Sequence, residues 1–281
     1  MRCGVVIAVR EVTAEEVAAF KRNGWAYLPQ LIPESAALKL RERAEARLGV
    51  HADGDPDIDR RFDIWSSYVD FGRKIDPEFW SVSTHENIGH NAAKLLGRES
   101  SIRLLSELLA IKVPQRNAGD KVIAGSAPTG WHQDWFTRGV DRTTLTTWIA
   151  LNEIPPERGS MRFLNGSHKL GALGVSAHES VAFGAPDEPE LPERWPDLAD
   201  CPISPPLHLR PGHATVHSAF VVHSAPANTT DQPRWVYLMG LYPGDAVYNG
   251  QPLGQFNGTN LKLGQVIDCP QFPVIYDPAR N

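Results

Sequence analysis

A histidine and an aspartate two residues apart are the most chemically suggestive side chains of the sequence. They are His132 and Asp134, within the peptide 130–135 (GWHQDW). On a β-strand, residues i and i+2 point to the same face, so an imidazole nitrogen and a carboxylate oxygen could bind one metal ion. The pair alone is equally compatible with an exposed, hydrogen-bonded turn. A metal site would therefore need a further ligand from a neighbouring strand.

Three histidines later in the chain could supply that ligand: His213, His217 and His223. Two histidines and one carboxylate form a facial set that leaves three adjacent positions of an octahedral Fe(II) open, as oxygen activation requires. The three residue numbers share the same parity, so on a regular strand all three side chains would point the same way. Strand alternation therefore leaves the third ligand undecided.

Motifs of several other catalytic classes are missing from the sequence. There is no glycine-rich dinucleotide or P-loop fingerprint, no HExxH and no GxSxG. The cysteines Cys3, Cys201 and Cys269 lie far apart, which predicts neither a disulfide framework nor a cysteine metal clip. The hydrophobic run 3–9 is followed by charged residues and lacks a cleavage site typical of a signal peptide. We therefore expect a reducing, cytoplasmic location.

Composition restricts the class of protein further. The 281 residues include 28 Lys plus Arg and 33 Asp plus Glu, a net charge of −5, which argues against nucleic-acid binding because that requires a basic patch. Hydrophobic residues make up 42% of the chain and are dispersed, so we expect a globular protein that does not span a membrane. The 23 glycines and 23 prolines favour many short strands joined by turns.

The pattern of elements changes near residue 100. Capping signals and apolar periodicity predict helices over 13–23, 33–48 and 86–96, with a strand over 25–31. After residue 101, β-branched and alternating runs predict strands over 102–109, 111–113, 143–151, 161–164, 214–222 and 235–242. This order is typical of an antiparallel sandwich or barrel behind a helical N-terminal part. The proline-rich stretch of about 170–206 is typical of a long functional loop, which we expect to be a lid.

Four ordered motifs resemble the phytanoyl-CoA dioxygenase family. They are GWHQDW at 130–135, TWIAL at 147–151, the stretch from GSMR at 159–162 to GSHK at 166–169, and HSAPANTTDQPR at 223–234. The likeness extends back through the N-terminal helices and so covers most of the chain. It implies one oxygenase domain over 1–281, with helices in 1–100 and a double-stranded β-helix (jelly-roll, cupin-like) in 101–281. It also implies Fe(II) and 2-oxoglutarate as cofactor and cosubstrate, with O2 as oxidant.

The resemblance assigns roles to individual residues. His132, Asp134 and His223 match the iron ligands, and Arg234, eleven residues after His223, matches the arginine that binds the far carboxylate of 2-oxoglutarate. A guanidinium suits this task because its planar fork meets a carboxylate through two hydrogen bonds. Trp148 matches an aromatic residue beside the cosubstrate, although a core tryptophan would fit the same strand. A further cosubstrate contact is expected from the strand 105–112, without an assigned side chain.

Two positions depart from the family pattern. Ala225 stands where many relatives have a serine, which removes a hydroxyl contact to the cosubstrate unless Ser224 replaces it. His213 stands where the family usually has an aspartate after a glycine. We interpret His213 as a turn residue and His217 as a buried, hydrogen-bonded histidine. The presence of Asp134 argues against halogenation, because related halogenases have a small residue there.

The substrate is expected to be a bulky, partly apolar small molecule, as in the biosynthesis of polyketide or terpenoid antibiotics. Hydroxylation is the default outcome, and epimerisation, desaturation and cyclisation are open alternatives. Candidate pocket residues are the loop 117–129, Trp65, Tyr68, Phe71, Trp135, Phe136 and Trp195, of which Trp65 and Phe71 could instead belong to the core. An acyl-CoA substrate is disfavoured because the sequence has no basic cluster that could bind its phosphates.

Two alternatives to an oxygenase stay open. A metal-dependent isomerase on the same scaffold would not need Arg234, and a catalytically silent binding module would be expected to lack at least one metal-binding residue.

Overall fold

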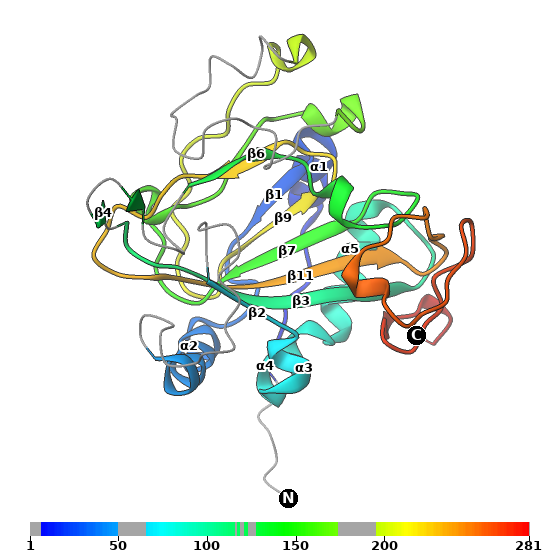
Figure 1. Cartoon of the computed structure of the whole chain (residues 1–281), viewed down its shortest axis with the longest axis horizontal. Helices are drawn as coiled ribbons and strands as arrows, with labels where there is room; N and C mark the ends of the chain where they lie inside the picture. The colour runs from blue at the N-terminus through cyan, green and yellow to red at the C-terminus, as the bar shows by residue number, and fades with distance from the viewer. Residues whose placement is uncertain are drawn as a thin grey trace, which may run out of the picture.

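The computed structural model describes residues 7–49, 66–115, 117–118, 121–122, 128–173 and 195–280. Within these ranges an antiparallel sheet of seven strands forms the centre of the molecule (Figure 1). Its strand order is β1-β9-β7-β11-β3-β12, and β2 also pairs with β3. The bounds are β1 Trp25–Leu28, β2 Ser66–Val69, β3 Ile102–Lys112, β7 Leu145–Ala150, β9 Ala214–Ser218, β11 Arg234–Pro243 and β12 Val274–Tyr276.

A second, smaller sheet covers one face of the large one. Its strand order is β6-β10-β8, with β6 at Thr129–His132, β10 at His223–Ala225 and β8 at Arg162–Phe163. The short strands β4 (Asn117–Ala118) and β5 (Lys121–Val122) pair separately. In Figure 1 strand β6 lies on one side of the large sheet, while helices α2, α3 and α4 lie on the other. Two facing antiparallel sheets form a jelly-roll, so the predicted fold class is confirmed.

The helices are α1 Ala14–Asn23, α2 Glu34–Leu48, α3 Phe71–Lys74, α4 Pro77–Ser83 and α5 Glu86–Leu96. The predicted capping box is present in α1, because the Thr13 side chain accepts from the Glu16 amide and Glu16 accepts from the Thr13 amide. Gly24 ends this helix in the left-handed conformation at φ 83°. The three predicted helices are confirmed, whereas α3 and α4 were not predicted. Every helix in the described part of the chain is too short or too polar to cross a membrane.

Strand alternation gives the large sheet two different buried faces. On β7, Leu145 and Ile149 pack into the main core beneath the helices, whereas Trp148 and Ala150 pack into a second core shared with the small sheet. Phe163 of β8 belongs to this second core and stacks on Trp25 of β1, with ring centroids 4.5 Å apart. We call the face toward the small sheet the inner face.

One predicted strand is wrong in a way that affects the site. The run 214–222 was expected to form one strand, but β9 ends at Ser218 and the chain turns before β10 begins at His223. The turn carries the chain from the large sheet to the small one. Strand 25–31 also ends early, at Leu28, whereas the runs 102–109 and 111–113 form the single strand β3. Of the expected lid at 170–206, residues 174–194 lie outside the described residues.

Candidate metal centre and cosubstrate site

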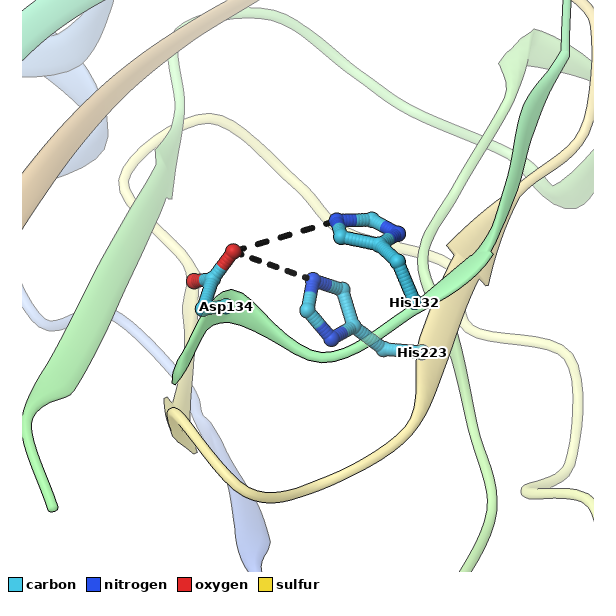
Figure 2. A group of neighbouring side chains, drawn as sticks. All are labelled: His132, Asp134 and His223. Atoms are coloured by element: carbon cyan, nitrogen blue, oxygen red, sulfur yellow. Dashed lines mark ion pairs between the residues drawn. The ribbon is translucent and has the colours of Figure 1, made fainter. Parts of the chain in front are cut away.

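The side chains of His132, Asp134 and His223 converge between the two sheets (Figure 2). Oδ1 of Asp134 lies 3.8 Å from Nε2 of His132 and 3.9 Å from Nε2 of His223. One potential ligand atom from each residue lies within 4.8 Å of the others, and no second set of this kind occurs among the described residues. Three such donors around one point match the donor set of a divalent transition metal.

Three different elements bring these candidate ligands together. His132 ends β6 directly opposite His223 of β10 in the antiparallel register. Asp134 begins the 3-10 helix η2 (Asp134–Thr137) instead of continuing the strand. The expectation that both residues converge holds, but the expected reason, alternation along a regular strand, is wrong. A turn after His132 swings the carboxylate back toward the two imidazoles.

Backbone carbonyl groups fix the orientation of both imidazoles. Nδ1 of His132 lies 2.8 Å from the carbonyl oxygen of Gly130, and Nδ1 of His223 lies 3.0 Å from that of Val221. Each carbonyl requires a donor, so Nδ1 carries the proton and the lone pair of Nε2 points toward Asp134. Burial lowers the pKa of His132, and burial with the neighbouring imidazoles lowers that of His223 further. Both rings are thereby kept neutral, which is the form that binds a metal.

Asp134 is held in its charged form. Burial alone would raise its pKa, but the Arg138 guanidinium, together with the nearby His217 side chain, outweighs burial and brings the pKa well below its usual range. An ionised carboxylate between two neutral imidazoles is a donor set that fits Fe(II).

The remaining candidate histidines occupy different places. His213 follows the turn before β9, and its Nδ1 contacts the Tyr27 hydroxyl. His217 lies on β9, is buried, and has Nε2 3.4 Å from Oδ2 of Asp134, the oxygen that faces away from the ligand set. Neither Nδ1 nor Nε2 of His217 has a hydrogen-bond partner among the described residues. His217 is therefore buried as expected, but the expected hydrogen bond is wrong. The turn between β9 and β10 therefore separates His217 from His223, which sequence parity could not do.

A second polar cluster surrounds Arg234, the first residue of β11. Arg234 lies opposite Lys112 of β3 in the register, and both side chains are buried. The guanidinium carbon lies 5.3 Å from the ring centroid of Trp148, and Nη1 donates to the carbonyl oxygen of Gly159 at 2.5 Å. The Arg234 Nε has no hydrogen-bond partner among the described residues. Arg234 and Trp148, predicted separately, are in contact.

Lys112 is a candidate site residue that sequence analysis did not assign. Its Nζ donates to Oγ1 of Thr129 and to the carbonyl oxygen of Pro226, both at 3.2 Å. Burial and the charge of Arg234 lower its pKa well below the usual range, and burial lowers the pKa of Arg234 to about 9. Two neighbouring buried cations are electrostatically unfavourable, so a bound anion would relieve both. Lys112 lies two and four residues after Ala110 and Leu108, which face inward. Alternation along the strand was therefore the sequence signal that could have placed its side chain on the inner face.

The structure shows whether Ser224 can replace the hydroxyl group that is absent at Ala225. Ala225 packs on the inner side with Trp148 and Val236. Ser224, its neighbour on β10, alternates to the opposite side, where its buried hydroxyl has no hydrogen-bond partner in the described part of the chain. Ser224 therefore does not replace the missing hydroxyl.

Some predicted pocket residues lie elsewhere. Phe71 and Tyr68 pack in the main core beneath the helices, on the face of the sheet away from the ligands, so their assignment to the pocket is wrong. Trp135 follows Asp134 and packs against Phe220, with ring centroids 4.7 Å apart. Trp195 donates from Nε1 to the carbonyl oxygen of Leu173. The positions outside the described residues, or without a described side chain, are Trp65, Phe136 and most of 117–128.

Comparison with protein families matches residues 2–236 to Phytanoyl-CoA dioxygenase (PhyH). The chain belongs to the phytanoyl-CoA dioxygenase family. It is accordingly an iron- and 2-oxoglutarate-dependent enzyme, as its structural relatives also are. No curated protein matched the chain in the sequence comparison.

Solved structures with a similar fold superpose over most of the chain. The non-haem α-ketoglutarate-dependent carbocyclase SnoK from nogalamycin biosynthesis has a TM-score of 0.70 and 25% identity, covering 93% of this chain and 96% of SnoK. The epimerase SnoN, in complex with Fe3+, α-ketoglutarate and nogalamycin RO, has a TM-score of 0.69 and 27% identity, covering 93% and 97%. EvdO2 from Micromonospora carbonacea var. aurantiaca, complexed with 2-oxoglutarate, shares the fold at a TM-score of 0.61 and 21% identity, covering 89% and 98%.

Proposed function

We propose that His132, Asp134 and His223 bind Fe(II), and that Arg234 and Lys112 bind the far carboxylate of 2-oxoglutarate. The observation that carries this proposal is the convergence of both imidazole Nε2 atoms on one oxygen of Asp134. Family membership supports the same three ligands, because the chain retains each of them at the matching motif position.

The residues around Arg234 suit a dicarboxylate cosubstrate. Its guanidinium offers Nε as an unused donor, and Lys112 adds a second positive charge beside it. Trp148 packs against the guanidinium and limits its movement. Binding a carboxylate here would replace repulsion between two buried cations with two charge-assisted contacts. The rigid pair therefore orients the cosubstrate before the reaction begins.

Iron supplies the activation of O2 coupled to decarboxylation of 2-oxoglutarate, which is the chemistry of this enzyme class. The protein contributes geometry: the carbonyl groups of Gly130 and Val221 fix the two imidazoles. The outcome at the substrate C–H bond then depends on substrate placement.

For the substrate we favour a bulky, partly apolar secondary metabolite, with hydroxylation, epimerisation or cyclisation as the reaction. SnoK and SnoN, which act in nogalamycin biosynthesis, support this class. Trp135 and Phe220 beside the ligand set provide aromatic surface for such a compound.

The test begins without substrate. Purified protein is mixed anaerobically with Fe(II) and 2-oxoglutarate, and the visible charge-transfer absorption of the complex is recorded. His132→Ala and His223→Ala should lose this absorption, whereas His208→Ala, an exposed histidine with a side chain 55% accessible, should retain it. Arg234→Ala should require far more 2-oxoglutarate for the same absorption. Unchanged 2-oxoglutarate dependence in Arg234→Ala would refute the cosubstrate assignment.

The substrate class is tested by succinate release in the presence of O2 and ascorbate. Polycyclic polyketides should accelerate succinate release, whereas acyl-CoA thioesters should not. Acceleration by acyl-CoA alone would overturn the proposed substrate class and leave the cofactor assignment intact.

A further inference from the structure

Two side chains donate hydrogen bonds to the second carboxylate oxygen of Asp134, and a third lies near it. Oδ1 faces the two ligand imidazoles, whereas Oδ2 accepts a hydrogen bond from Oγ1 of Thr146 at 2.7 Å. Arg138 donates to the same Oδ2 from Nη2, and Nε2 of His217 lies 3.4 Å from it. The two oxygens of one carboxylate are thus turned toward different partners.

The contacts among these partners have consistent donors and acceptors. Nη2 of Arg138 donates to Oγ1 of Thr146 at 2.6 Å, so this hydroxyl is free to donate its single proton to Asp134. Thr146 and His217 lie opposite each other in the register of β7 and β9, on the inner face. They form a rigid platform beneath the carboxylate because both belong to the large sheet.

Arg138 is itself fixed by its surroundings. It directly follows η2, and its side chain is 13% accessible. Gly240 of β11 leaves room for it, because a Cβ at Gly240 would lie 3.2 Å from Nη1 of Arg138. The C-terminal segment holds the adjacent backbone: the Asn249 amide donates to the carbonyl oxygen of Gly139 at 3.1 Å. The guanidinium cannot swing away without disturbing these contacts.

We propose that Arg138 and Thr146 are positioning residues that restrict Asp134 to binding the metal through Oδ1 alone. A carboxylate free to rotate can bind a metal through both oxygens and so occupy an additional coordination position. Holding Oδ2 with two hydrogen bonds prevents that rotation. The metal position that the second carboxylate oxygen would otherwise occupy stays available, and the cosubstrate and O2 require it. This inference rests on the proposed ligand set and adds the residues that orient it.

The test compares near-isosteric variants on one strand. Thr146→Val removes the hydroxyl, Thr146→Ser retains it, and Thr147→Val is the matched control on the opposite face of β7. Arg138→Met removes the guanidinium, the other hydrogen-bond donor to Oδ2 of Asp134. Fe(II) affinity and the position of the charge-transfer absorption with 2-oxoglutarate are measured for each folded variant, with circular dichroism as the check on folding.

Thr146→Val and Arg138→Met should weaken Fe(II) binding about 10- to 100-fold, as loss of residues that orient metal ligands generally does. Both should also shift the absorption, whereas Thr146→Ser and Thr147→Val should resemble the wild type. Wild-type affinity and spectrum in both Thr146→Val and Arg138→Met would overturn the positioning role alone. Absence of the absorption in the wild-type protein would instead overturn the ligand set, and this inference with it.

Discussion

At the scale of single residues, the cosubstrate site contains a trade-off between stability and binding. Lys112 and Arg234 are neighbouring buried cations, and burial lowers the pKa of each. A protein keeps such a pair only when something compensates, and functional sites are where such costs are usually found. An anion bound between them, as we propose for the cosubstrate, would supply that compensation.

We predict that Lys112→Met raises the KM for 2-oxoglutarate on the order of 10-fold, because one charge-assisted contact is worth about 1.5–3 kcal/mol. Fe(II) affinity should be unchanged, because Lys112 is not in the ligand set. Thermal unfolding with increasing 2-oxoglutarate measures the effect: the cosubstrate should raise the melting temperature of the wild type more than that of the variant. Equal increases in the two proteins would contradict a cosubstrate role for Lys112.

The sequence was informative for residues that belong to a local motif. His132, Asp134, His223 and Arg234 could be named because each lies in a short ordered peptide. Lys112 could not be assigned, because its role depends on which residue of β11 faces it across the sheet. Register between distant strands is a tertiary property that no local pattern contains.

At the scale of elements, the loop between β10 and β11 connects His223, a proposed metal ligand, to Arg234. Asn228 is buried in this loop, and its Nδ2 donates to the carbonyl oxygens of Lys112 at 3.0 Å and Gln232 at 2.7 Å. Its Oδ1 accepts from the amide of Thr230 at 3.0 Å and from the Thr230 hydroxyl at 2.7 Å. One side chain thus satisfies four partners and ties the loop to β3.

Asn228→Ala should lower the free energy of unfolding by about 2–4 kcal/mol, because buried polar partners lose their hydrogen bonds. Urea denaturation measures this loss. Asn228→Asp keeps the acceptor oxygen but loses the amide donors, so it separates the two halves of the network. A loss below about 0.5 kcal/mol in Asn228→Ala, a size typical of surface substitutions, would show that the loop is held by other contacts.

Elements with strong local signals were predicted well, and those set by packing were not. Helix α1 begins after Thr13 and ends before Gly24 because its capping groups lie in the sequence. The break between β9 and β10 has no comparable signal, since the residues from Ala219 to Val222 are all apolar, as those of a buried strand would also be. The error made His217 and His223 look equivalent, although they lie on different sheets.

At the scale of the whole molecule, the two faces of the large sheet have different surroundings. The inner face carries the charged residues of the site, while the outer face packs beneath the helices. Glu107 of β3 is an exception on the outer face: it is buried, and its Oε1 accepts from the Arg73 amide at 3.0 Å. Burial raises the pKa of this carboxyl group above its ordinary value.

Glu107 binds its proton more tightly in the folded protein than in the unfolded chain. The free energy of unfolding should therefore fall as pH rises above about 4.5 and through the pKa of Glu107 in the folded protein. Glu107→Gln cannot titrate and should lack this decrease. The difference in melting temperature between Glu107→Gln and the wild type should therefore shift in favour of the variant between pH 5 and pH 8. A difference independent of pH would show that Glu107 does not titrate differently on folding.

The separation of the two polar clusters between layers has a consequence for cosubstrate choice. Two imidazoles come from the small sheet, and the two buried cations come from the large one. A molecule that chelates iron at one end and pairs with the cations at the other must span from one layer to the other. Phe163 and Trp25 stack between these layers, so we expect their packing to influence which length of dicarboxylate fits. Selection of a five-carbon keto acid over shorter ones would be a property of the core between the sheets as much as of the charged residues themselves.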